Sequence, residues 1–144
     1  MSDTYLIAFD GSGASHRALT YGADRAKAQG ASVVLAHVLE WSPYSFLSAE
    51  EVAERHKRRE QEVGRAETII LNPMKEKLTA GGLRVETVVR YGHIAEVLCD
   101  LAKEYDASQI FVGRTGEKGL QARLFGSVPA TLAQVSPVPC TIVP

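Results

Sequence analysis

Three glycines and a serine in the last third of the sequence have the spacing of a phosphate-binding loop. Gly113 and Gly116 are followed, after nine further residues, by Gly126 and Ser127. Glycine lets backbone amides approach an anion closely, and a helix N-terminus offers unpaired N–H groups with a partial positive charge. Each glycine alone is equally typical of a turn, but the full spacing, after a predicted strand and before a predicted helix, favours phosphate binding.

Other groups around this stretch complete a nucleotide site. The hydroxyl of Ser127 can donate to a phosphate, and Asp10, at the end of the first predicted strand, can accept hydrogen bonds from ribose hydroxyls. Backbone groups of Ala8 and Val38, at the ends of the first two strands, can contact the base. Capping of the first helix is the alternative role of Asp10. Positive charge is available from the loop at Arg114, Lys118 and Arg123.

The elements that must position these residues alternate along the chain. Apolar runs bounded by turn residues predict strands, and apolar residues at three- and four-residue steps predict helices. The strands are expected at 5–9, 32–39, 84–91, 109–112 and 138–143, and the helices at 14–29, 50–67, 94–102 and 128–134. This alternation predicts an α/β fold, in which a five-stranded parallel sheet lies between two helical layers in a doubly wound α/β/α sandwich. We expect one domain over residues 1–144.

The segment 50–67 differs in composition from the rest, because it is densely charged with both signs. Val52, His56 and Val63 still give it a sparse apolar stripe, so we predict a long surface helix. Pro73 is expected either to end or to kink that helix, because proline lacks a backbone donor. Acids and bases nearly cancel, which favours a solvated helix face.

The composition excludes several classes of function. Lys and Arg number 16 against 17 Asp and Glu, so no excess of basic charge favours binding to nucleic acid. No long apolar run predicts a membrane span or an export signal, and we expect a cytoplasmic protein. The two cysteines, Cys99 and Cys140, lack metal-site spacing and are expected to be buried thiols. The four histidines also lack metal-ligand spacing, so structural or surface roles are expected for them. No dinucleotide fingerprint or P-loop occurs.

These residues together are those of a known family. The chain resembles the universal stress proteins over its whole length: its first strand ends in Asp10-Gly11-Ser12, His37-Val38 closes the second strand, Gly92 precedes the third helix, and the motif Gly-x-x-Gly-x(9)-Gly-Ser follows the fourth strand. In that family the motif marks the members that bind ATP. The resemblance implies an adenine nucleotide α-hydrolase-like fold and a homodimer paired through the C-terminal strand, residues 138–143.

The resemblance also implies which residues bind ATP or AMP, with or without Mg²⁺. The expected set is Ala8, Phe9, Asp10, Val38, Val112, Gly113, Arg114, Thr115, Gly116, Gly126, Ser127 and Val128. Two positions depart from the family pattern. Thr115 stands where many nucleotide-binding members have histidine, and Pro129 stands where serine, threonine or alanine is usual. Because proline has no N–H, one phosphate donor is missing at that position.

The function expected from the sequence is regulation. We expect a nucleotide-binding, stress-response sensor that acts as a homodimer on a regulatory protein partner that the sequence does not identify. Phosphoryl transfer needs a positioned nucleophile and metal-holding carboxylates, and no such pair stands at the loop, so no catalytic residue is assigned. The alternatives are a weak ATPase or nucleotide transferase, with slow hydrolysis at most, and a dimeric interaction module that has lost its ligand.

Overall fold

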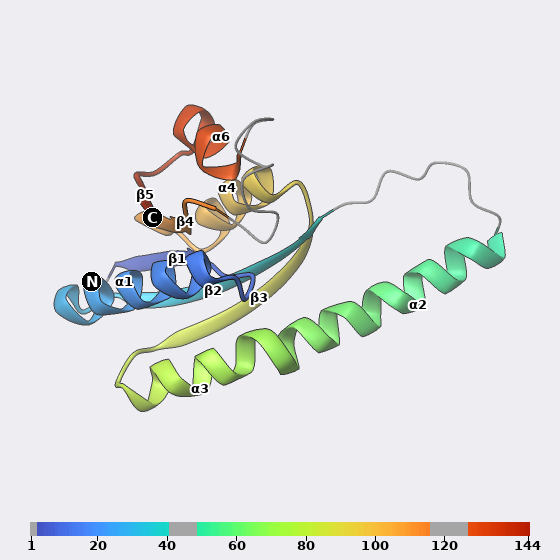
Figure 1. The fold of residues 1–144 in the computed structure, drawn as a ribbon, viewed down its shortest axis with the longest axis horizontal. Coiled ribbons are helices and arrows are strands. Elements are labelled where there is room, and N and C mark those ends of the chain that lie inside the picture. Colours follow the sequence, from blue (N-terminus) through green and yellow to red (C-terminus); the bar gives the residue numbers. More distant parts are fainter. Residues whose placement is uncertain (1–2, 41–48, 116–126) are drawn as a thin grey trace.

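The computed structural model describes residues 3–40, 49–115 and 127–144. Five strands form one sheet in the order β3-β2-β1-β4-β5, and every neighbouring pair is parallel. The strands are β1 (Thr4–Ala8), β2 (Ser32–Glu40), β3 (Val85–Gly92), β4 (Gln109–Gly113) and β5 (Cys140–Val143). The sequence prediction of a five-stranded parallel α/β fold is therefore confirmed (Figure 1).

Helices cover both faces of the sheet. They are α1 (Gly13–Gln29), α2 (Ala49–Arg65), the π-helical segment η1 (Ala66–Leu71), α3 (Asn72–Ala80), α4 (Ile94–Glu104) and α6 (Val128–Val135). One core cluster joins the sheet to α1, η1 and α3, and a second joins its other face to α4 and α6. Because both faces are covered, the central strands are apolar on both sides, as a parallel sheet requires.

The first helix fits closely against the sheet because of its termini and its small residues. Ser12 caps it, since its side chain accepts a hydrogen bond from the Ser15 amide at 3.2 Å, and Gly30 ends it in the left-handed conformation. Gly22 lies directly over the sheet, where a Cβ atom would come within 2.8 Å of the Ile7 side chain. The predicted close-packing face of this helix is confirmed.

The predicted long surface helix is present but is more continuous than expected. It runs through α2, η1 and α3 without a break, and Pro73 lies in the first turn of α3. Just before it, the Asn72 amide donates to the carbonyl of Glu67, five residues back. This wider turn makes room where proline would clash with the carbonyl four residues earlier. Pro73 therefore neither ends the helical run nor stands at a break in it.

The last strand is shorter than predicted. It begins at Cys140, not at residue 138, because Pro139 has no N–H to donate to the ladder. The Pro139 carbonyl still accepts from the Ile110 amide at 2.9 Å, so the strand docks beside β4 one residue before it formally begins. Before it, the Ser136 hydroxyl donates to the Val138 carbonyl at 2.7 Å and accepts from the Val138 amide.

Tyr91, near the end of β3, holds α2 to the sheet. Its hydroxyl donates to Glu62 Oε2 at 2.5 Å, and the guanidinium of Arg59 lies over its ring, 5.1 Å from the centroid. Burial, together with the hydrogen bond to Glu62, raises the pKa of Tyr91 to about 12. The phenol therefore keeps its proton, and the bond to α2, at any physiological pH.

The raised pKa gives a measurable pH dependence. Because the folded pKa of Tyr91 exceeds its ordinary value of 10.0, its contribution to stability is complete below pH 10 and is lost as the pH rises towards 12. An absorbance titration of phenolate is expected to show one of the five tyrosines ionising late, and Tyr91→Phe is expected to remove that late step. If Tyr91→Phe instead removed one of the tyrosine ionisations at the ordinary pKa, the assignment would be contradicted.

Candidate nucleotide-binding site

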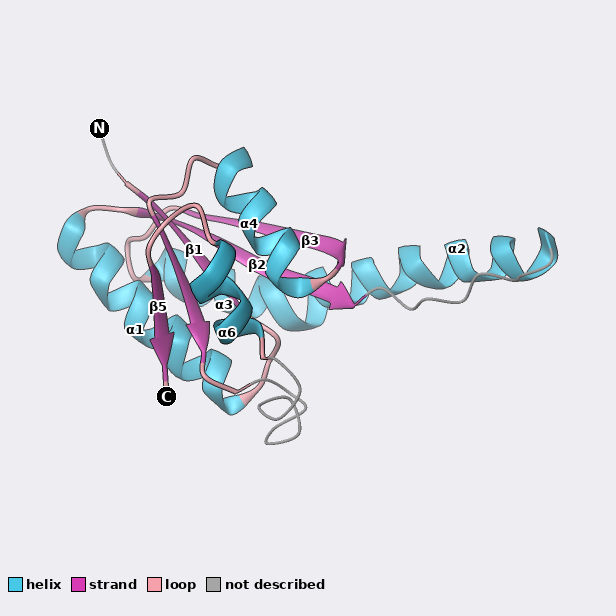
Figure 2. Cartoon of the chain, turned by 90° about the horizontal axis from the view of Figure 1, so that it is seen from above, coloured by secondary structure: helices cyan, strands magenta, loops and turns pink. Residues whose placement is uncertain are grey.

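The candidate site lies at the carboxyl ends of two neighbouring strands, the central β1 and β4. The chain passes from β1 outward to β2 and β3 on one side, and β4 and β5 lie on the other, so the strand order reverses between β1 and β4. Their register pairs Ile7 with Phe111, and one more residue brings Ala8 level with Val112. In open α/β sheets such a reversal is where ligands bind, and Figure 2 shows the strands fanning out toward their carboxyl ends.

Asp10 holds the turn that leaves β1. Its Oδ1 atom accepts a hydrogen bond from the Ser12 amide at 2.8 Å, and Gly11 takes a positive φ of 85° between them. The helix cap itself is Ser12 and not Asp10. The carboxylate is half-buried at the edge of the sheet, where it fixes the path of the chain into α1.

Both backbone groups of Phe9 make hydrogen bonds within the fold. Its amide donates to the Ala36 carbonyl at 2.8 Å, and its carbonyl lies 2.8 Å from Nδ1 of the buried His37. The bond to a carbonyl requires that His37 carry its proton on Nδ1. The Phe9 side chain is buried and meets the ring of His16 edge to face at 4.8 Å. His37 thus has the structural role predicted for it and ties the ends of β1 and β2 together.

The end of β4 is packed tightly against α1. A Cβ atom on Gly113 would lie 2.8 Å from the Ala14 Cβ and 2.9 Å from the Ala14 carbonyl carbon, so no side chain fits there. The Arg114 amide donates to the Val143 carbonyl at 2.7 Å, which extends the pairing with β5. The Arg114 side chain is exposed, and Thr115 is half-buried.

The start of α6 carries the second half of the predicted motif. Ser127 caps the helix, and its Oγ atom accepts from the Ala130 amide at 3.3 Å. Pro129 is buried in the first turn, where a missing N–H is tolerated. Gly116 and Gly126, together with Lys118 and Arg123, lie outside the described residues.

Three apolar candidates lie on the same face of the sheet. Ala8, Val38 and Val128 are half-buried, and each packs against the core cluster that α4 and α6 share with the sheet. They come from the ends of β1 and β2 and from the start of α6, which the sequence separates by up to 120 residues. Val112 is buried within that cluster. The fold therefore places these three apolar residues on one face of the sheet, against one core cluster.

Two further features of the described residues bear on the chemistry. No three His, Cys, Asp or Glu side chains among them lie close enough to hold a metal ion. None of the helices in the described ranges is long and apolar enough to cross a membrane. The cysteines are both free thiols there; Cys99 is buried, which raises its pKa, and Cys140 is half-buried.

Comparisons with known proteins agree with this architecture. The model of the universal stress protein family matches residues 1–144. The universal stress protein YxiE of Bacillus subtilis (strain 168) is 33% identical, with 99% of each chain covered. The solved structure of the hypothetical protein MJ0577 has a TM-score of 0.80 at 20% identity, covering 99% of this chain and 96% of that one. A universal stress protein solved in complex with cAMP has a TM-score of 0.68 at 23% identity, covering 99% and 97%. The chain belongs to the universal stress protein family.

Proposed function

We propose that this protein binds an adenine nucleotide, ATP or AMP, at the carboxyl edge of β1 and β4 and acts as a cytoplasmic stress-response regulator. The observation that carries the proposal is that the apolar trio of Ala8, Val38 and Val128 is half-buried on one face of the sheet, while Asp10 follows β1 by two residues. A purine needs an apolar surface with backbone groups at its rim, and a ribose needs a hydrogen-bond acceptor nearby. The structural relative solved in complex with cAMP supports the same class of ligand.

The phosphates are assigned to the start of α6. Ser127 accepts one hydrogen bond from the Ala130 amide, and a hydroxyl keeps its own proton for donation to a phosphate oxygen. The helix N-terminus adds a partial positive charge. Next to Gly113, the side chain of Arg114 is exposed to solvent and can pair with a phosphate of the nucleotide. We assign Gly116 and Gly126 to phosphate binding because they belong to the sequence motif. Any Mg²⁺ would be held mainly by the phosphates, as is usual for that ion.

Calorimetric titration with ATP, ADP, AMP and cyclic AMP tests the proposal. We expect saturable heat with at least one of the four, together with a rise in melting temperature, because a ligand that binds only the folded state stabilises it. GTP serves as a control for the base, because the apolar trio does not supply partners for its extra polar groups. Absence of both heat and thermal shift with all four adenine nucleotides would reject the proposal.

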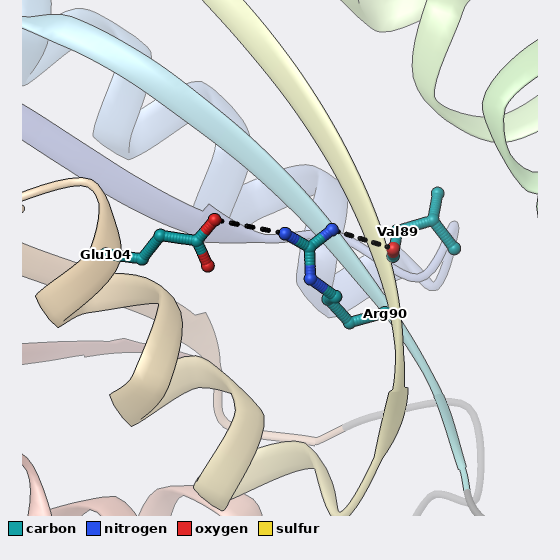
Figure 3. A network of polar contacts seen from close by, with 3 residues as sticks. All are labelled: Val89, Arg90 and Glu104. Carbon is teal, nitrogen blue, oxygen red and sulfur yellow. Dashed lines mark hydrogen bonds and ion pairs between the residues drawn. The ribbon is translucent and has the colours of Figure 1, made fainter.

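We also propose that the regulator is a homodimer paired through β5, and the two edges of the sheet support this assignment. Just before β3, the Arg84 carbonyl accepts a hydrogen bond from the Val33 amide of β2. Because successive carbonyls of a strand alternate in direction, the Val89 carbonyl faces the free edge. Arg90 covers it: its Nη1 donates to that carbonyl at 3.4 Å while its Nη2 pairs with Glu104 at 3.1 Å (Figure 3). A charged pair on an edge strand opposes association there.

The opposite edge has no such protection. The strand β5 reads Cys-Thr-Ile-Val and contains no charged residue. Ile142 on the strand is 42% exposed, and Val135 at the end of α6 is 57% exposed. An uncharged edge strand with apolar side chains is a ready partner for a second copy of itself. We therefore assign the dimer contact to β5.

Ile142→Lys is expected to convert the dimer to a monomer. A lysine on the edge strand would place two like charges across the two-fold contact and remove apolar area. Size-exclusion chromatography with light scattering gives the mass directly. Ile69→Lys is the matched control, because Ile69 on η1 is 61% exposed and lies on the other side of the sheet from α6. A wild-type monomer, or a dimer that persists with Ile142→Lys, would contradict the assignment.

A further inference from the structure

The two cysteines lie on the same face of the sheet, in the core cluster that α4 and α6 share with it. Cys99 belongs to the buried side of α4, which packs beside α6, and is 8% exposed (Figure 1). Cys140 is the first residue of β5 and pairs in register with Ile110 of β4. Residues paired in this way point to the same face of a sheet, and Ile110 is buried in that cluster. The fold therefore directs both thiols, which are far apart in the sequence, into one cluster.

Both sulfur atoms approach the short connection between α6 and β5. The Cys99 thiol donates to the carbonyl of Val135, at the end of α6, at 3.9 Å, and the Cys140 thiol donates to the carbonyl of Val138 at 3.7 Å. The Val138 carbonyl also accepts from the Ser136 hydroxyl at 2.7 Å, so it does not depend on the thiol. Because thiols are weak donors, each sulfur can turn away from its carbonyl at little cost.

The electrostatics of Cys99 agree with a close approach of the two thiols. Burial raises the pKa of Cys99 most, and the next largest cause is Cys140, ahead of three charged residues of α4 itself, Glu96, Asp100 and Lys103. Since the interaction between charges falls with distance, this order indicates that Cys140 is a near neighbour of the Cys99 sulfur. Burial also keeps Cys99 in its less reactive, protonated form, so the half-buried Cys140 is the thiol that meets an oxidant first.

We propose that Cys99 and Cys140 form a redox site, at which a peroxide joins α4 to β5 through an intramolecular disulfide. The Cys140 thiolate attacks hydrogen peroxide, the O–O bond breaks, and the products are a sulfenic acid at Cys140 and hydroxide. The Cys99 sulfur then attacks the Cys140 sulfur, the S–O bond breaks, and the leaving hydroxide takes the Cys99 proton as water. Two thiols and one peroxide thus give one disulfide and two waters. The reaction needs neither a bound nucleotide nor a second copy of the chain.

The disulfide would enclose the whole phosphate motif. The chain between Cys99 and Cys140 contains β4, the motif residues from Gly113 to Ser127, and α6. Closing this loop removes conformations from the unfolded chain, so unfolding becomes less favourable in the oxidised protein. Oxidation therefore acts on the stability of the part of the fold that carries the start of α6 and the strand β5. Disulfides that form transiently in this way are the kind that sense oxidants in reducing compartments.

Counting thiols after treatment of the full chain with hydrogen peroxide tests the proposal. At low protein concentration we expect both thiols to be lost to alkylation in denaturant, with a mass lower by about 2 Da and a single chain on a non-reducing gel. Peptide mapping is expected to find Cys99 joined to Cys140, and dithiothreitol to restore both thiols. The melting temperature is expected to rise on oxidation, and Cys99→Ser is expected to abolish that rise.

A thiol moved by one residue gives the matched control. Thr141→Cys combined with Cys140→Ser places the sulfur on the other face of the sheet, because residue 141 pairs in register with Phe111 of the opposite cluster. This variant is expected to form no disulfide with Cys99 under the same treatment. Three outcomes would overturn the proposal: two thiols that persist in peroxide that oxidises the urea-unfolded chain, a disulfide between two chains in place of one within a chain, or an equal yield from the moved thiol.

Discussion

Gly113→Ala is expected to lower the free energy of unfolding by about 1–3 kcal/mol, the usual cost of forcing one extra carbon into a packed site. The new Cβ would lie 2.8 Å from the Ala14 Cβ and 2.9 Å from its carbonyl carbon. Because one of these atoms belongs to the backbone, α1 must move away from β4 to admit it. Thermal or urea unfolding followed by circular dichroism measures the loss.

A second glycine provides the control for this change. Gly64 lies in α2, and a Cβ added there meets nothing within 4 Å. Gly64→Ala is therefore expected to stabilise the protein by about 0.5–1 kcal/mol, because alanine favours the helix. A Gly113→Ala variant as stable as the wild type would show that the start of α1 moves freely, and that Gly113 is required for another reason.

The fold could be predicted because local patterns and one topological rule determine it. Apolar runs such as 32–39 indicate strands, and the apolar stripes between them indicate helices. Helical connections between parallel strands then place helices on both faces of the sheet. What the pattern missed depends on single backbone groups. The wider π turn before Pro73 makes room for the proline ring, and the late start of β5 at Cys140 follows from the missing N–H of Pro139. In both cases, where the chain adjusts to the proline depends on tertiary packing.

The positions of the predicted site residues follow only partly from the sequence. The positions of Ala8 and Val38 follow from parallel strands whose carboxyl ends share one edge, whereas Val128 begins a helix and is placed by the packing of α6. The hydrogen bond of the Phe9 carbonyl could not be predicted, because its partner, the His37 ring, is 28 residues away and no local pattern indicates it. Gly113 shows a similar limit: the motif assigns its glycine to phosphate binding, whereas the described contacts account for it by close packing on Ala14.

The second large effect concerns Asp10, whose carboxylate has two separable roles. In the fold, Oδ1 accepts from the Ser12 amide at 2.8 Å. In the proposed site, the charged group accepts from ribose hydroxyls. Asp10→Asn keeps an Oδ1 atom for the turn but loses the negative charge and one acceptor. Because hydrogen bonds to charged groups contribute about 1.5–3 kcal/mol, we expect adenine nucleotide affinity to fall about tenfold to a hundredfold.

Stability measurements separate the two roles. Asp10→Asn is expected to unfold at the same temperature as the wild type without nucleotide, since the turn bond is kept. Asp10→Ala removes both interactions, so it is expected to lose affinity and also about 0.5–1.5 kcal/mol of stability, the usual contribution of one hydrogen bond. Calorimetry and thermal unfolding of both variants give the comparison. If Asp10→Asn bound nucleotide as tightly as the wild type, the carboxylate would serve the turn alone, and the ribose would have to be bound by other groups at the strand ends.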